Sequence, residues 1–323
     1  MEMYVNSFEP EERSGHLVSS QIKKLWNIQL ILATELLAVC KKHNLKIWAS
    51  DGTALGAIRH KGFIPWDDDM DFMMMREDYD KLLKIAPTEI KSPFFFQCAY
   101  TEQGYYRGHA QMRYNDTTMI LPEEAHLGKS FHQGVFIDIF VADGVPENDA
   151  ELDSLATMRS QILTYLNFRN TPSYPRFSPN YLLSFLKAKK ALGEMAQWDD
   201  IRLYSYLEEL FRKTPAKSAR QISTIMFTSL KSLYADPHWF DEIIWMPFEK
   251  TSIPVSAEYD RYLTSRYGDY MKPVKGGTVH GTLLLDTEKS YKEYLKQLRY
   301  SGLHIKIHFI KSIFSGAFRK VFK

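Results

Sequence analysis

The stretch 47-IWASDGTALGAIRHKGFIPWDDDMDFMMM-75 decides how this chain is interpreted. Four aspartates stand within five residues, directly before an apolar run; they are Asp67, Asp68, Asp69 and Asp71. Carboxylates held this close repel one another, and burial makes the repulsion worse. A solvated acidic loop would avoid the conflict, but the FMMM run is typical of a buried strand. These residues therefore favour an acidic site at the edge of a sheet, where a cation balances the charges.

Alternate aspartates are expected to share one face of this strand. On an extended chain every second side chain points the same way, so Asp67, Asp69 and Asp71 are grouped and Asp68 points away. Mg²⁺ prefers oxygen ligands and commonly binds one or two carboxylates together with substrate phosphates. We therefore expect Asp69 and Asp71 to bind Mg²⁺, with Mn²⁺ as an alternative. An EF-hand does not fit, because Phe72 stands where that loop requires glycine.

A third carboxylate should complete such a site. The candidate is Asp138, a lone acid at the centre of the apolar stretch 135-VFIDIF-140. An unpaired charge there would be costly, so it needs a partner. A buried salt bridge to an arginine is the alternative to a metal or base role.

Upstream, 50-SDGTALG-56 places a glycine and a hydroxyl just after a predicted strand. Glycine lets backbone N–H groups approach a phosphate, and the start of the following helix favours anions. Arg59, His60 and Lys61 then add positive charge that suits a diphosphate. The simpler interpretation of the glycine is an ordinary turn, and that of the basic residues is a solvated loop.

Composition and charge narrow the class of protein. The chain has 323 residues, enough for one large domain or two smaller ones, and 45% of them are hydrophobic. A net charge of +2 lacks the strong basic bias of nucleic-acid binders. Cys40 and Cys98 show no metal-ligand spacing, which favours a reduced, cytoplasmic compartment. No signal peptide is recognised, and the apolar stretch 28–40 is too short to cross a bilayer.

Hydrophobic periodicity predicts an α/β (α+β) fold. A helix is expected over 18–43, with Asn44 as its stop signal, and another over 76–87, closed by Pro87. A hairpin over 243–255 and a helix over 256–268, stopped by Gly268, follow later, with a last helix over 287–301. The expected strands are 45–50, 68–75, 94–99, 109–114, 117–121 and 134–141.

These elements divide the chain into five parts. Residues 1–44 form an N-terminal helix that packs on the core, and 45–146 form the catalytic core. Residues 147–235 are a mainly helical insertion, interrupted by the proline-rich 170–180, and 236–300 return to the core. Residues 301–323 form a basic amphipathic tail.

The stretch 48-WASDGTALGAIRHKGFIPWDDDMDFMMMREDYDKL-82 resembles the signature of the LicD family of phosphotransferases, relatives of fukutin and fukutin-related protein in the nucleotidyltransferase superfamily. The resemblance implies a nucleotidyltransferase-like mixed sheet flanked by helices. It also implies a glycine-plus-hydroxyl motif, matched by Gly52 and Thr53, and a D-x-D pair, matched by Asp69 and Asp71. Asp138 is assigned as the third carboxylate.

Two later segments also resemble the family. In 111-QMRYNDTTMI-120 the Arg-x-x-x-x-Thr pattern of the family places Arg113 near the site. The segment 243–281 resembles its closing region, and His280 stands at about the expected place. The resemblance thus covers roughly 45–145 and 243–281, while 147–235 carries no motif that transfers.

Members of this family move a phospho-alcohol from a CDP-activated donor to a hydroxyl of a cell-surface glycan, with CMP released. For this chain the resemblance implies phosphocholine first, hence CDP-choline as donor and a glycan or lipid-linked glycan as acceptor, or else a polyol phosphate. Asp138 would bind a second metal or take the acceptor proton, and Asp67 would be a further ligand or an acceptor contact. The expected substrate-binding residues are Asp51, Gly52, Thr53, Arg59, Lys61, Arg113 and His280.

Two other functions stay open at this point. A D-x-D motif also serves metal-dependent glycosyltransferases that use a nucleotide-sugar, although the preceding DGTALGAIRHKGFIPWD has no role in that scheme. A non-catalytic protein that binds a nucleotide and a metal is the third hypothesis.

The tail 299-RYSGLHIKIHFIKSIFSGAFRKVFK-323 contains no acidic residue. Its apolar residues recur at helical spacing with basic residues mostly opposite, which is typical of a helix lying on an anionic membrane. We therefore expect peripheral contact of 303–323 with the inner face of the plasma membrane. A helix docked on the protein's own core is the alternative.

Overall fold

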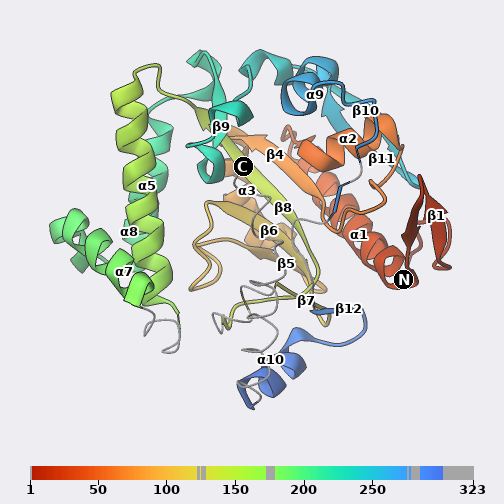
Figure 1. The fold of residues 1–323 in the computed structure, drawn as a ribbon, viewed down its shortest axis with the longest axis horizontal. Coiled ribbons are helices and arrows are strands. Elements are labelled where there is room, and N and C mark those ends of the chain that lie inside the picture. Colours follow the sequence, from red (N-terminus) through yellow and green to blue (C-terminus); the bar gives the residue numbers. More distant parts are fainter. Residues whose placement is uncertain are drawn as a thin grey trace.

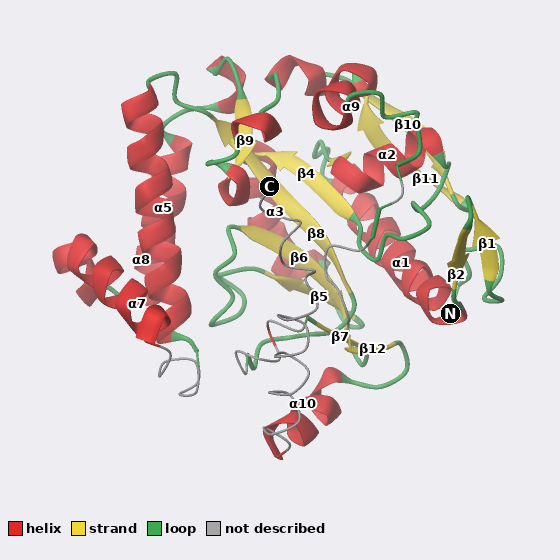
Figure 2. Ribbon diagram, viewed as in Figure 1, coloured by secondary structure: helices red, strands yellow, loops and turns green. Residues whose placement is uncertain are grey.

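The computed structural model describes residues 2–121, 124, 129–171, 179–274, 276–277 and 284–300, and a mixed sheet lies at its centre (Figure 1). The predicted α/β (α+β) class is confirmed: six strands form this sheet, and helices surround it (Figure 2). The order is β3–β4–β8–β6–β5, with β9 also paired to β8. β4 and β8 run parallel, and the other neighbours are antiparallel. The strands are β3 (Trp48–Ala49), β4 (Asp71–Met75), β5 (Phe94–Gln97), β6 (His109–Tyr114), β8 (Phe136–Gly144) and β9 (Ile222–Thr224).

The two faces of the sheet differ in chemistry because side chains alternate along each strand. One face of β4 and β8 is apolar and buried, with Phe72, Met74, Ile137 and Ile139 each almost fully enclosed. The opposite face carries Asp71, Asp138 and further polar residues of β6. The two acidic side chains thus share one face of this strand pair.

Helix α1 (Ser20–Lys42) supports the acidic loop from behind. The Ser19 side chain caps its first turn by accepting from the backbone N–H of Ile22, and the chain leaves it at Asn44 with φ +52°. Trp26 Nε1 donates to the carbonyl of Asp67 at 2.9 Å, and Gln29 Nε2 donates to that of Asp68 at 2.9 Å. The helix therefore fixes the backbone of the loop while leaving its carboxylates to other contacts.

The segment after β8 contains α5 (Asp149–Arg169), α7 (Pro179–Leu192) and α8 (Asp200–Arg212). An ion cluster anchors it to the core: Arg76, the first residue of α3 (Arg76–Glu89), binds both oxygens of Asp143 at 2.8 and 2.7 Å and Glu208 of α8 at 3.0 Å. All three side chains are at least nine-tenths buried. Beyond α8 the chain forms short 3-10 turns and returns to the central sheet as β9, which the helical prediction for 147–235 did not include.

The closing part of the chain lies on the core as predicted. The hairpin of β10 (Ile243–Phe248) and β11 (Thr251–Ser256) contacts β3 and α2 (Asp51–Arg59), and α9 (Tyr259–Tyr267) contacts α2. Gly268 ends α9 with φ +63°, as the stop signal predicted. Helix α10 (Tyr291–Tyr300) lies within the predicted 287–301.

Several predicted boundaries were wrong. The strand expected at 45–50 is only two residues long, because its pairing with β4 covers only Trp48 and Ala49. Pro87 lies inside α3, which continues to Glu89. The strand expected at 117–121 is confirmed as β7 (Thr118–Ile120), which pairs with β12 (Leu284–Asp286) outside the central sheet. A hairpin of β1 (Glu11–Arg13) and β2 (His16–Val18) precedes α1 where no strand was predicted.

Among the residues that the structure describes, no helix has the length and apolar character needed to cross a bilayer. The predicted amphipathic tail, 303–323, and His280 both lie outside the described residues.

Candidate active site

Asp71 and Asp138 stand opposite each other on neighbouring strands. Asp71 opens β4, Asp138 is the third residue of β8, and the parallel register pairs the two residues directly. The backbone N–H of Asp138 also donates to the carbonyl of Met70 at 2.9 Å. Two acids that lie 67 positions apart in sequence are thus brought to adjacent places on one face.

Asp71 lies in a strongly negative environment. Burial comes first in raising its pKa well above the usual range, and the carboxylates of Asp69, Asp138, Asp51 and Asp67 each add to the effect. Asp68 is not among the carboxylates that raise this pKa most, and its side chain is buried. This division agrees with the period of two expected for an extended chain.

The chemistry of these donors fits a hard divalent cation, because oxygen ligands suit Mg²⁺ and a cation would relieve the repulsion around Asp71. Within the described part of the chain, however, no three His, Cys, Asp or Glu side chains are grouped closely enough to hold a metal ion. The residues therefore fit Mg²⁺ in kind, but their arrangement is not that of a closed three-ligand centre.

Asp138 is held by two side chains of β6. Gln111 Nε2 donates to Oδ1 of Asp138 at 2.7 Å, and His109 Nε2 lies 3.0 Å from the same oxygen. Both neighbours are at least nine-tenths buried. Neither was singled out from sequence, although His109, Gln111 and Arg113 occupy alternate positions of a predicted strand, a pattern that indicates a polar face.

Arg113 lies behind Asp138 and is fully buried, not on the surface of the site. Its guanidinium donates to Gln97 Oε1 at 2.7 Å, to the carbonyl of Gly134 at 2.7 Å and to Gln111 Oε1 at 2.5 Å. Burial lowers the pKa of Arg113. The structure thus places this predicted substrate-binding residue where it orients Gln111, which in turn contacts Asp138.

The start of α2 lies beside the acids. The backbone N–H of Asp71 donates to Thr53 Oγ1 at 2.8 Å, which ties β4 to this helix. A Cβ on Gly52 would stand only 2.7 Å from Oδ2 of Asp67, so the glycine is required for the close approach. The first N–H groups of a helix lack internal partners and favour an anion. The predicted Gly52 and Thr53 therefore stand at the edge of the acidic cluster.

Helix α9 closes the site from the far end of the chain. Arg266 Nε lies 3.3 Å from Oδ1 of Asp51, and the Arg266 guanidinium stands over the Tyr262 ring, 5.3 Å from its centroid. The backbone N–H of Asp51 donates to Tyr262 Oη at 3.0 Å. Arg266 thus offsets part of the negative charge around Asp71. No spacing signal links these residues to the acids in sequence, so they were not predicted.

Of the predicted basic residues, Arg59 ends α2 and Lys61 lies on the loop that follows. Arg59 is half-buried and donates to the carbonyl of Tyr270 at 2.8 Å and to His60 Nε2 at 2.9 Å. Burial lowers the pKa of Arg59. Lys61 is exposed, with φ +54°. Arg59 is therefore held in place by the segment that follows α9, whereas the Lys61 side chain faces solvent.

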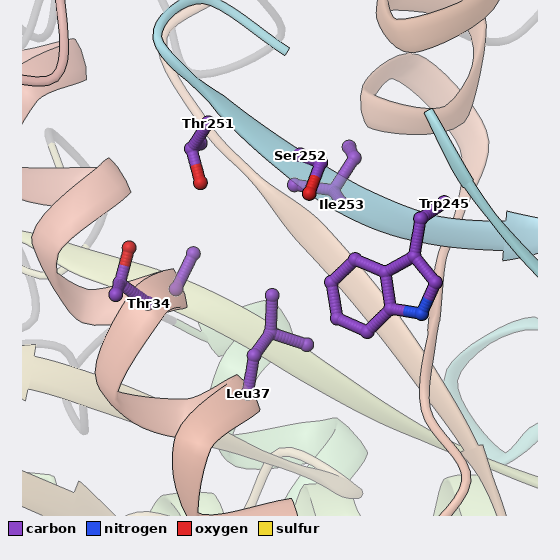
Figure 3. A pocket seen from close by; sticks show the side chains of 7 residues that line it. Thr34, Leu37, Trp245, Thr251, Ser252 and Ile253 are labelled. Carbon is purple, nitrogen blue, oxygen red and sulfur yellow. The ribbon is translucent and has the colours of Figure 1, made fainter. Parts of the chain in front are cut away.

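A pocket of about 150 Å³ lies elsewhere, between α1 and the β10–β11 hairpin (Figure 3). It contains no ionisable side chain, so it does not suit a phosphate. Its lining residues are Ala33, Thr34, Leu37, Trp245, Thr251, Ser252 and Ile253.

Comparison with known proteins agrees with this geometry. The family model described as LicD/FKTN/FKRP, nucleotidyltransferase domain, matches residues 44–143. The chain is 27% identical over 238 residues to the lipopolysaccharide cholinephosphotransferase LicD of Haemophilus influenzae, which covers 73% of this chain and 85% of that protein. It is 35% identical over 107 residues to an uncharacterized protein of Rickettsia prowazekii, covering 33% of this chain and 36% of that protein.

Proposed function

Because the chain belongs to the LicD family through its nucleotidyltransferase domain at residues 44–143, we propose that it transfers phosphocholine from CDP-choline to a hydroxyl of a cell-surface glycan. The similarity to a lipopolysaccharide cholinephosphotransferase supports this choice of group and acceptor. The observation that carries the proposal is the direct pairing of Asp71 with Asp138 beside the start of α2. A polyol phosphate, carried by CDP-glycerol or CDP-ribitol, is the other group that the family suggests.

In this reaction the acceptor oxygen forms a bond to the phosphorus of phosphocholine. The bond between that phosphorus and the oxygen bridging to CMP breaks, and CMP leaves. The hydroxyl proton passes to Asp138, whose carboxylate is oriented by His109 and Gln111. Asp138 therefore needs to be ionised when the acceptor binds.

Asp69 and Asp71 would hold Mg²⁺, with Mn²⁺ as the substitute and Asp67 as a further ligand or acceptor contact. When bound, the cation neutralises phosphate charge and the charge that develops on the leaving group. The first N–H groups of α2, around Gly52 and Thr53, would bind a phosphate oxygen. Arg59, at the end of α2, and Lys61, on the adjoining loop, add positive charge.

Arg113 takes a supporting role in this proposal. Since its guanidinium is enclosed by Gln97, Gly134 and Gln111, it acts on the acceptor side only by fixing the amide that contacts Asp138. Asp51 likewise serves the site through its ion pair with Arg266. In this proposal Arg113 and Asp51 act by positioning neighbouring groups of the site.

The experiment is to measure Mg²⁺-dependent CMP release from CDP-choline, CDP-glycerol and CDP-ribitol. CDP-choline should be used best, and Asp69→Asn and Asp71→Asn should each abolish release. Asp153→Asn is the matched control, since this acid is exposed on α5. Persistent release in both Asn variants would refute the role of the acidic pair, and release from a nucleotide-sugar alone would refute the function.

A further inference from the structure

Two phenylalanine rings form a partly exposed aromatic wall beside Asp138. Phe140 belongs to β8, and Phe227 belongs to the 3-10 turn Ile225–Phe227 that follows β9. Their ring centroids lie 5.9 Å apart with planes tilted by 41°, and the His109 ring lies 4.9 Å from that of Phe140. Both phenylalanines are half-buried, whereas most aromatic residues of the core are fully enclosed.

The wall lies at a distance that suits the head group of the proposed donor. Phe140 follows Asp138 by two residues, so both side chains point to the same face and stand about 7 Å apart along the strand. The P–O–C–C–N chain of phosphocholine spans a comparable length. A phosphorus held near Asp71 and Asp138 would therefore place its quaternary ammonium close to the two rings.

The electrostatics favour a cation at this place. An aromatic face attracts a quaternary ammonium through its quadrupole, and the nearby carboxylates of Asp138 and Asp71 add long-range attraction. Two neighbouring rings already lie beside a cationic side chain. The Arg107 guanidinium stands 5.6 Å from the centroid of the Tyr105 ring and 5.8 Å from that of the Phe131 ring. Within the part of the chain that the structure describes, no lysine or arginine stands over the rings of Phe140 or Phe227.

The tryptophans near the site are less suitable. Trp48 is 1% exposed and packs edge-on against Phe240. Trp66 lies before the aspartates, but Gly276 approaches its ring so closely that a Cβ there would stand 2.6 Å from Nε1. His16 packs against it edge-on, at 6.2 Å.

We propose that Phe140 and Phe227 form the subsite that binds the trimethylammonium group of the donor and so selects choline over uncharged alcohols. This inference rests on the proposed function, and it identifies the residues that set donor choice. Leucine at either position keeps apolar bulk but removes the aromatic face, whereas tyrosine keeps the face.

The test compares kcat/KM for CDP-choline with that for CDP-glycerol in Phe140→Leu and Phe227→Leu. We expect the ratio to fall roughly 5- to 30-fold in each leucine variant and to be retained in Phe140→Tyr and Phe227→Tyr. Trp245→Leu is the control, since this exposed tryptophan lies in the pocket of Figure 3. Binding of both donors by calorimetry gives the same ratio without turnover.

The possible outcomes distinguish failure of this inference from failure of the proposed function. If wild type prefers CDP-choline and both leucine variants keep that preference, the aromatic subsite is refuted and the function stands. An equal loss for both donors in the leucine variants also refutes the subsite, because it indicates a packing role. If wild type uses CDP-glycerol but not CDP-choline, the choice of phosphocholine itself is refuted.

Discussion

Replacing Asp71 by asparagine should stabilise the protein when no divalent cation is present. Burial and four nearby carboxylates raise the pKa of Asp71 in the folded state, so the folded protein holds this proton more tightly than the unfolded chain does. The resulting penalty is absent below the ordinary pKa of about 4. It grows as the pH rises through the window above that value, where wild type loses stability relative to Asp71→Asn.

The size of the effect follows from the strand pairing. Asp71 and Asp138 are direct neighbours on parallel strands, about 5 Å apart, and at an effective dielectric constant of about 20 two such charges repel by roughly 3 kcal/mol. Asp71 is only half-buried, so solvent screens part of this repulsion. We expect a gain of about 1–3 kcal/mol in the free energy of unfolding at pH 7, or roughly 2 °C in Tm for each kcal/mol.

The assay is thermal unfolding of wild type and Asp71→Asn between pH 5 and 8, with and without Mg²⁺. In the presence of chelator the variant should melt higher, and the difference should shrink toward low pH. Added Mg²⁺ should raise the Tm of wild type but not of the variant. A variant that melts lower at every pH, or an equal response of both proteins to Mg²⁺, would refute the account of the acidic cluster.

Three further results are expected. Gly52→Ala should reduce kcat/KM roughly 10- to 100-fold, because the added Cβ would displace the Asp67 carboxylate. Gly277→Ala is the control and should leave kcat/KM unchanged, since there is open space around Gly277. Equal effects of the two substitutions would contradict this prediction. Arg76→Met should lower the free energy of unfolding by roughly 3–5 kcal/mol in urea titration, since it leaves buried carboxylates unpaired; a change under 1 kcal/mol would show the cluster to be dispensable. Deleting 303–323 should abolish sedimentation with anionic vesicles, and unchanged binding would refute the membrane role.

The strands that carry the acids were predictable because their signal is local. β4 lies within the predicted 68–75, and the predicted 134–141 covers most of β8, since continuous apolar runs indicate strands buried on at least one face. The β1–β2 hairpin was missed because its residues are mostly polar and its strands pair only with each other. β9 was missed for another reason: its three residues become a strand only by pairing with the end of β8.

The sequence predicted a site residue only where burying its side chain without a partner would cost free energy. Asp138 stood out because a lone carboxylate in an apolar strand needs a partner. His109 and Gln111 carry no such penalty in sequence, since each is an ordinary residue in a half-polar strand. Arg113 was expected to bind substrate because the family's Arg-x-x-x-x-Thr pattern places it near the site. A motif does not tell which neighbour a long side chain will reach.

The contact between α9 and α2 explains why the closing segment belongs to the core. Asp51 adds a charge to a site that already holds four other carboxylates, and its ion partner, Arg266, is supplied by a helix more than 200 residues later. The same helix provides the Tyr262 hydroxyl that accepts from the Asp51 backbone, so its docking fixes both the charge and the position of the start of α2. A chain lacking α9 would therefore have a more strongly negative site with a less fixed start of α2. These contacts join the parts at 45–146 and 236–300, although a long, mainly helical segment separates them in sequence.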